Sequence, residues 1–120
     1  MPADSNTRTL GSDAEDQALE FLTKQACKSI TRNYHCRSGE IDLIVEDGET
    51  LVFVEVRFRK NLSRGSGAES ITRQKMRRII RTAEHFLLNH QQFRAMPCRF
   101  DVISIGDKID WYQQAFTSDT

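Results

Sequence analysis

The chain has 120 residues with 17 Lys and Arg against 17 Asp and Glu, so its formal net charge is zero. This length predicts one domain with its own core, and the neutral balance argues against a general nucleic-acid coat. The three cysteines, Cys27, Cys36 and Cys98, have no disulfide or zinc-site spacing, and neither a signal core nor a membrane-length apolar run is found. We therefore expect a cytoplasmic protein with reduced thiols and no membrane contact.

The charge is distributed unevenly along the chain. Residues 1–56 carry 5 basic and 11 acidic side chains, whereas residues 57–81 carry 9 basic and 1 acidic side chain. A contiguous basic block beside acidic strands is the arrangement expected if a polyanion is drawn to a metal site.

A single domain is predicted over residues 12–116, between a flexible segment at 1–11 and a frayed tail at 117–120. The run Ser12-Asp13-Ala14-Glu15 has the capping-box pattern, and apolar residues follow it with helical spacing. These signals predict a first helix over about 13–27.

Three strands follow this helix, the first within 29–36 and the next two near 40–46 and 50–58. The dipeptide Asp47-Gly48 predicts a two-residue hairpin turn between the last two, because a type I′ turn needs positive φ at both central positions. In the register that this turn sets, Glu40 lies opposite Glu55 and Asp42 lies diagonal to it.

Side-chain alternation gives this hairpin one apolar face and one divided face. The apolar face holds Ile41, Leu43, Val45, Val52, Val54, Val56 and Phe58. The divided face is apolar toward the turn, at Ile44, Leu51 and Phe53, and carries Glu40, Asp42, Glu55 and Arg57 toward the open end.

Three carboxylates against one guanidinium need compensation, because an unpaired carboxylate in an apolar sheet costs several kcal/mol. A hard cation, Mg²⁺ or Mn²⁺, bound by Glu40, Asp42 and Glu55 would neutralise them. In the alternative interpretation, Glu40 and Glu55 are surface charges and Arg57 is their partner.

A glycine-containing loop is expected at 61–69, and a second helix at about 71–90. One stripe of this helix is apolar, and its four arginines point mostly away from the stripe. Lys75 falls at the edge of the stripe, so we expect the helix N-terminus to bring Gln74 and Lys75 near the acidic cluster. The alternative for the outward arginines is an ordinary solvated face.

A buried strand is predicted over residues 99–105, parallel to strand 50–58 because a helix connects the two. Asp101 on this strand is interpreted as a structural acid paired with Arg99. A turn and a last strand from residue 109 to about 113 complete the predicted fold.

The order of these elements resembles the restriction-endonuclease-like nuclease core, an α/β (α+β) fold with a mixed sheet in αβββαββ order and helices packed on it. More closely, five successive segments resemble the motifs of the YraN family, bacterial nuclease-like proteins related to archaeal Holliday-junction resolvases. The segments are residues 14–18, 39–44, 53–59, 72–75 and 99–102, and the resemblance covers about 11–116.

The resemblance implies that Asp42 and Glu55 are the two metal-binding acids of an Asp…Glu-x-Lys motif, and that Glu15 joins them. Arg57 stands where the motif most often has lysine; arginine offsets phosphate charge but is a poor base because it stays protonated. Lys75 is a candidate for a displaced lysine. Glu15 has an alternative role as the reciprocal partner in the capping box.

The resulting hypothesis is a nucleic-acid-binding protein acting as a metal-dependent DNA endonuclease on branched structures, with Asp42, Glu55, Arg57 and Lys75 as catalytic residues. One alternative is a weak or inactive DNA- or RNA-binding module of the same fold, and a less favoured one is a protein-interaction domain. A homodimer is implied only by the likeness to resolvases. The predicted nucleic-acid contacts are Arg59, Lys60, Arg64, Arg73, Gln74, Arg77, Arg78 and Arg81.

Overall fold

The computed structural model describes residues 9–59 and 71–118. Along the chain lie α1 (Thr9–Lys24), β1 (Lys28–Cys36), β2 (Gly39–Asp47), β3 (Thr50–Phe58), α2 (Arg73–Asn89), the short 3₁₀ helix η3 (Gln91–Phe93), β4 (Cys98–Ile105) and β5 (Ile109–Phe116). The predicted αβββαββ order is confirmed, with η3 as an addition. The predicted loop at 61–69, with Lys60 and Arg64, lies outside the described residues, as do residues 1–8 and 119–120.

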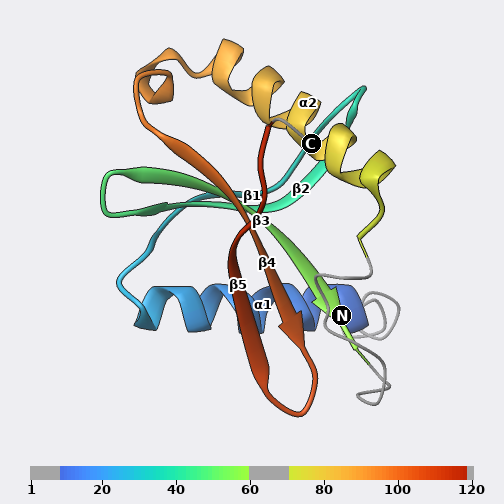
Figure 1. Cartoon of the computed structure of the whole chain (residues 1–120). Helices are drawn as coiled ribbons and strands as arrows, with labels where there is room; N and C mark the ends of the chain where they lie inside the picture. Colours follow the sequence, from blue (N-terminus) through green and yellow to red (C-terminus); the bar gives the residue numbers. More distant parts are fainter. Residues whose placement is uncertain (1–8, 60–70, 119–120) are drawn as a thin grey trace, which may run out of the picture.

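The five strands form one mixed sheet in the order β1-β2-β3-β4-β5. β1, β2 and β3 are antiparallel neighbours, β3 and β4 are parallel as predicted, and β4 and β5 are antiparallel. The helices lie on opposite faces of this twisted sheet, α1 on one side and α2 on the other (Figure 1). Within the described ranges, no helix combines the length and apolar character needed to cross a membrane.

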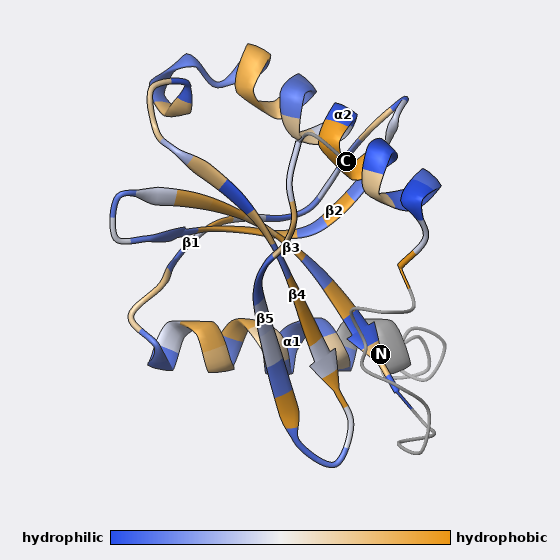
Figure 2. Cartoon of the chain, in the orientation of Figure 1, coloured by the Kyte–Doolittle hydropathy of each residue, from blue (hydrophilic) through white to orange (hydrophobic). Residues whose placement is uncertain are grey.

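Each face of the sheet has its own apolar layer, to which one helix contributes. Apolar and polar segments alternate along both helices (Figure 2). The α1 layer joins Ala14, Ala18 and Leu22 to Leu43, Val45, Val52, Val54, Ile103 and Ile105. The α2 layer joins the predicted stripe of that helix, including Ile79, Ala83 and Phe86, to Ile44, Leu51, Phe53, Phe100 and Val102. Two-sided burial explains the long apolar runs of β3 and β4.

The predicted hairpin register is wrong by two residues. Asp47 pairs with Thr50, and Ile44 with Phe53, so the two central turn residues are Gly48 and Glu49. Gly48 has φ +64°, and Glu49 does not have positive φ, which is the pattern of a type II′ turn with glycine first. A shift of two leaves each residue of β3 on its predicted face. The observed register therefore does not place Glu40 opposite Glu55, as the predicted one did.

The face predicted for Ile41 is also wrong, because this side chain packs in the α2 layer, apart from Leu43 and Val45. Its partner on β1 is Tyr34, which packs on the same side. Between Tyr34 and Arg32, Asn33 adopts φ +57°, a left-handed conformation that asparagine tolerates better than most residues. Strict alternation therefore fails at this end of the hairpin.

The first helix begins at Thr9 instead of near residue 13, so Ser12 lies inside the helix. The capping-box role of Glu15 is therefore wrong, since an N-cap residue must precede the helical turn. α2 is close to its prediction: Thr72 is its N-cap and accepts a 3.1 Å hydrogen bond from Lys75 N. β5 extends to Phe116, three residues beyond its predicted end.

Candidate functional site

The site begins where β2 and β3 stop pairing. Leu43 and Val54 form the last ladder pair, and beyond them Val56 N donates a 2.8 Å hydrogen bond to Asp42 Oδ2. The Asp42 carboxylate thus takes a backbone donor that a continuing ladder would give to a β2 carbonyl. This opening of the sheet fixes the side chain between the two strands.

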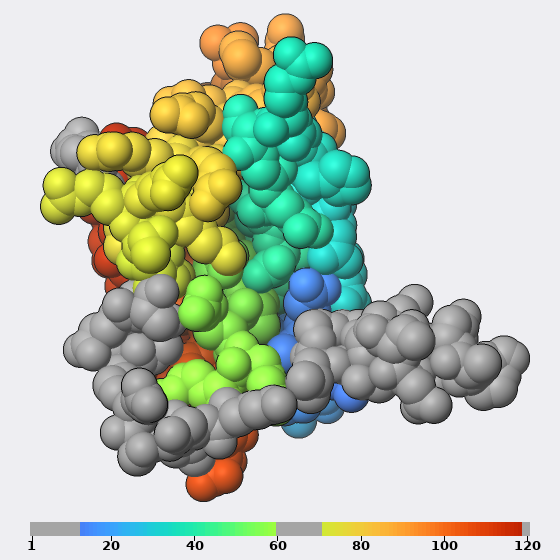
Figure 3. Space-filling model, turned by 90° about the vertical axis from the view of Figure 1, so that its right-hand side faces the viewer, coloured from blue at the N-terminus to red at the C-terminus, as the bar shows by residue number. Residues whose placement is uncertain are grey.

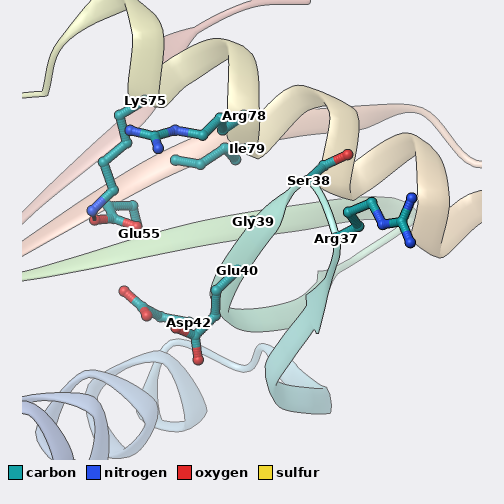
Figure 4. A pocket seen from close by; sticks show the side chains of 9 residues that line it. All are labelled: Arg37, Ser38, Gly39, Glu40, Asp42, Glu55, Lys75, Arg78 and Ile79. Atoms are coloured by element: carbon teal, nitrogen blue, oxygen red, sulfur yellow. Dashed lines mark ion pairs between the residues drawn. The ribbon is translucent and has the colours of Figure 1, made fainter.

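Glu55 lies beside this opening and is only 5% exposed. Lys75 Nζ in the first turn of α2 lies 2.8 Å from Glu55 Oε2, and Arg57 Nη1 lies 4.0 Å from the same oxygen. Figure 4 shows Lys75 over Glu55, with the Asp42 and Glu40 side chains on the opposite side of the opening. The structure therefore brings Asp42, Glu55, Arg57 and Lys75 together, and the expected approach of α2 is confirmed.

The pKa of the Asp42 carboxyl is raised to about 7. Burial is the largest cause, followed by the charge of Glu55, with Glu15 and Glu40 adding smaller effects in the same direction. The hydrogen bond from Val56 N acts the opposite way by stabilising the carboxylate. Negative charge at this point is therefore incompletely balanced by the protein's own groups.

Glu15 reaches the site from α1, and two residues of β1 hold it. Arg32 Nη2 lies 3.4 Å from Glu15 Oε1, while Arg32 Nη1 lies 2.9 Å from Asp16 Oδ1. With its amide nitrogen turned toward Glu15, Asn33 donates to both carboxylate oxygens at 3.1 and 3.2 Å. The residue is anchored near Asp42, whereas Glu40 is exposed at the rim.

Two cavities open on either side of the acids, and Asp42, Glu55 and Lys75 line both. The first, of about 460 Å³, lies between α2 and the turn that joins β1 to β2. The second, of about 310 Å³, lies between α1 and the end of β3. In the space-filling view, α2, β2, the end of β3 and α1 meet on one face (Figure 3).

Among the described residues, no three His, Cys, Asp or Glu side chains form a preassembled metal-binding group. The donor set nevertheless fits a hard divalent cation, because Mg²⁺ is usually held by one or two carboxylates and completes its shell with water or substrate oxygens. Asp42 carries the unbalanced charge, and Glu55 has one oxygen engaged by Lys75. Asp42 and Glu55 are thus the two carboxylates that could hold such a cation, while Glu40 lines the first cavity and Glu15 the second.

The predicted nucleic-acid contacts on α2 are exposed: Arg73, Gln74, Arg77, Arg78 and Arg81. Arg78 also lines the first cavity. Arg59 is partly buried just beyond β3, and its backbone N–H donates to Ile105 O at 2.8 Å. Lys60 and Arg64 lie outside the described residues.

Sequence reasoning missed three residues of this region. Arg37 lines the first cavity from the turn between β1 and β2, although its side chain extends away from the acids (Figure 4). Arg32 and Asn33 anchor Glu15 from β1. The asparagine between two strand-forming segments was an available signal, because asparagine is enriched at left-handed positions.

The fold and site together define a class of protein: an α+β domain with a mixed five-stranded sheet, covered on both faces, that is split open around paired acids and a lysine. Residues 14–105 match the Uncharacterised protein family UPF0102, and the chain belongs to this family, the YraN family that its motifs indicated. All the acids and cations of the site described above lie within the matched residues.

Relatives that carry the family's name resemble this chain over most of their lengths. The UPF0102 protein of Saccharophagus degradans is 47% identical over 108 residues, which cover 89% of this chain and 92% of that protein. The one of Alcanivorax borkumensis is 44% identical over 125 residues, covering 99% and 100%. The one of Nitrosomonas eutropha is 48% identical over 114 residues, covering 93% and 97%. These names state a family and no activity.

Proposed function

We propose that this protein binds DNA and hydrolyses its phosphodiester bonds with a divalent cation held by Asp42 and Glu55. The observation that carries the proposal is the meeting of Asp42, Glu55 and Lys75 at one opening of the sheet, between two cavities. The exposed arginines of α2 beside this opening suit a phosphate backbone, because cationic side chains supply most of non-specific DNA affinity.

The residues have distinct tasks in this proposal. Asp42 and Glu55 would hold the cation. Bound Mg²⁺ or Mn²⁺ supplies Lewis acidity and lowers the pKa of water in its coordination shell. Lys75 and Arg57 offset the negative charge that develops on the phosphate oxygens as a water oxygen bonds to phosphorus and the bond from phosphorus to the leaving sugar oxygen breaks. The proton of the attacking water passes to solvent, and the leaving oxygen takes a proton from solvent.

Lys75 bears on the choice between an active nuclease and the alternative of a binding module without turnover. The sequence offers arginine at position 57, which stays protonated and cannot act as a base. The Lys75 ammonium, 2.8 Å from Glu55, adds a second cation to the site; ion-paired in this way it offsets charge, as Arg57 does, and is not a base. Two cations beside Glu55 can stabilise the charge that develops in the transition state, and this supports an active nuclease over a binding module without turnover.

The experiment is a cleavage assay on linear, flapped and four-way-junction DNA with Mg²⁺ or Mn²⁺. Wild type is compared with Asp42→Asn, Glu55→Gln and, as a matched control, Asp107→Asn, which changes an exposed acid in the turn between β4 and β5. We expect metal-dependent cleavage by wild type and Asp107→Asn, and its loss in the two site variants. Equal cleavage by all four proteins would overturn the proposal, and tight binding without cleavage by wild type would favour the binding module.

A further inference from the structure

Phe58 is the last residue of β3, and it is 43% exposed. Among the described residues, only Phe58 and Leu88 are large apolar residues with such exposure. A single exposed apolar residue is common and needs no function. Phe58, however, lines the cavity between α1 and β3 that Asp42, Glu55 and Lys75 also line.

The backbone around Phe58 is fixed by the sheet. Phe58 pairs with Ile105 of β4, and Arg59 N donates to Ile105 O at 2.8 Å. Val54 and Val56 pack against the α1 layer, but Phe58 lies beyond that layer. An aromatic ring with few rotatable bonds on a fixed strand offers contact area at a small entropic cost.

The surroundings of Phe58 match those of an aromatic side chain that stacks on a base. Proteins that bind single strands combine a positively charged groove with aromatic rings on which bases stack. Arg57 precedes Phe58 and lines the same cavity, as does Lys75. Phe58 follows Glu55 by three positions, about 10 Å along the strand, and its side chain lies on the other face. Both residues line the same cavity at the strand's end, so the ring would lie within reach of a nucleotide that flanks a phosphate at Glu55.

We propose that Phe58 stacks on an unpaired base of DNA, next to the phosphate that the proposed cation and Lys75 bind. This inference rests on the proposed function and adds its substrate class: DNA with unpaired nucleotides at the site, in preference to continuous duplex. In a duplex, neighbouring bases already cover both faces of each base. An exposed ring gains a stacking partner only where such a neighbour is missing.

The test compares binding of a 20-nucleotide single strand and of the matching duplex, by fluorescence anisotropy at one salt concentration and without added metal. The proteins are wild type, Phe58→Ala, Phe58→Trp and the control Leu88→Ala, which removes the other exposed apolar side chain from the last turn of α2. We expect Phe58→Ala to lose roughly tenfold in single-strand affinity, within the range of one base stacked on an aromatic ring, and less than twofold on duplex. Phe58→Trp and Leu88→Ala should bind like wild type.

A second readout detects the stack itself. The single strand carries 2-aminopurine, whose fluorescence reports changes in stacking on binding. We expect its signal with Phe58→Leu, which keeps apolar volume but lacks a ring, to differ from that with wild type, and the signal with Phe58→Trp to remain close to wild type. Thermal unfolding of each variant verifies that it is folded.

Failure of the stacking role and failure of the proposed function give different results. If wild type binds DNA but Phe58→Ala keeps its single-strand affinity, or loses both affinities equally, the stacking role is overturned and the proposed function stands. If wild type binds neither DNA, both without metal and with Mn²⁺ added, the proposed function fails, and the stacking role fails with it.

Discussion

Asp101 on β4 and Asp42 on β2 are acids on inner strands of the same sheet, but their surroundings are opposite. Asp101 is fully buried, and its oxygens accept hydrogen bonds from Arg99 Nε at 3.0 and 3.2 Å, from Trp111 Nε1 at 2.9 Å and from Gln114 N at 3.0 Å. β5 bulges to supply the last donor, with Gln114 at φ +54°. The predicted pairing with Arg99 is thus confirmed as part of a larger network.

Asp42, by contrast, accepts a hydrogen bond from Val56 N and lies near the carboxylates of Glu55, Glu15 and Glu40, which raise its pKa. Its raised pKa reports the cost of ionising it there. The fold therefore supplies hydrogen-bond donors for the carboxylate of Asp101. At Asp42 it leaves negative charge that an added cation could balance.

The largest effect is expected from breaking the satisfied network. Asp101→Ala leaves Trp111 Nε1, Gln114 N and Arg99 Nε without their buried acceptor, while Arg99 keeps its 2.8 Å ion pair with Asp47. We expect a loss of about 3 kcal/mol in the free energy of unfolding. Urea denaturation measures it. Asp107→Asn, in the exposed turn after β4, should change stability by less than about 0.5 kcal/mol. A loss for Asp101→Ala as small as that of the control would contradict the account.

Asp42→Asn should raise the free energy of unfolding, whereas Asp101→Ala lowers it. Because the folded-state pKa is about 7 and the ordinary value is 3.8, the folded protein keeps a proton between these values that the unfolded chain has lost. Wild-type stability therefore falls as pH rises through this window. The asparagine has no such proton, so we expect Asp42→Asn to be about 1–2 kcal/mol more stable than wild type at pH 8, with the advantage gone at pH 4.

Urea denaturation at several pH values without divalent cations measures this difference. A gap between the two proteins that stays constant from pH 4 to pH 8 would show that Asp42 ionises normally, and the contrast with Asp101 would then disappear.

The smallest effect is expected for Lys75, whose side chain is 40% exposed. Lys75→Met should lower the free energy of unfolding by about 1 kcal/mol, because a partly solvated ion pair is discounted by the surrounding water. In a double-mutant cycle with Glu55→Gln, the coupling should account for most of that loss. Arg73→Met, on the same turn of α2 and exposed, is the matched control with no expected change. A coupling free energy of zero would show that Lys75 and Glu55 do not stabilise each other.

The sequence was sufficient for the order of elements, because hydrophobic periodicity and Gly-containing turns act locally. The N-terminus of α2 near Glu55 also followed from chain connectivity. The hairpin register could not be predicted in this way. Gly48 suits either the first or the second central position of a two-residue turn, and tertiary packing selects the first.

The opening of the sheet at Asp42 could not be predicted from strict alternation of side chains. It depends on the left-handed Asn33, on the change of face at Ile41 and on the hydrogen bond between Val56 and Asp42. None of these breaks the two-residue period in the sequence. The charged residues of the site were identified by their types, but their geometry comes from this irregularity.

Titration of Mn²⁺ into the protein by isothermal calorimetry tests whether Asp42 and Glu55 bind a divalent cation. We expect saturable binding to wild type and to Asp107→Asn, with loss in Asp42→Asn and Glu55→Gln. Binding that is unchanged in both site variants, or undetectable in wild type, would contradict the proposal.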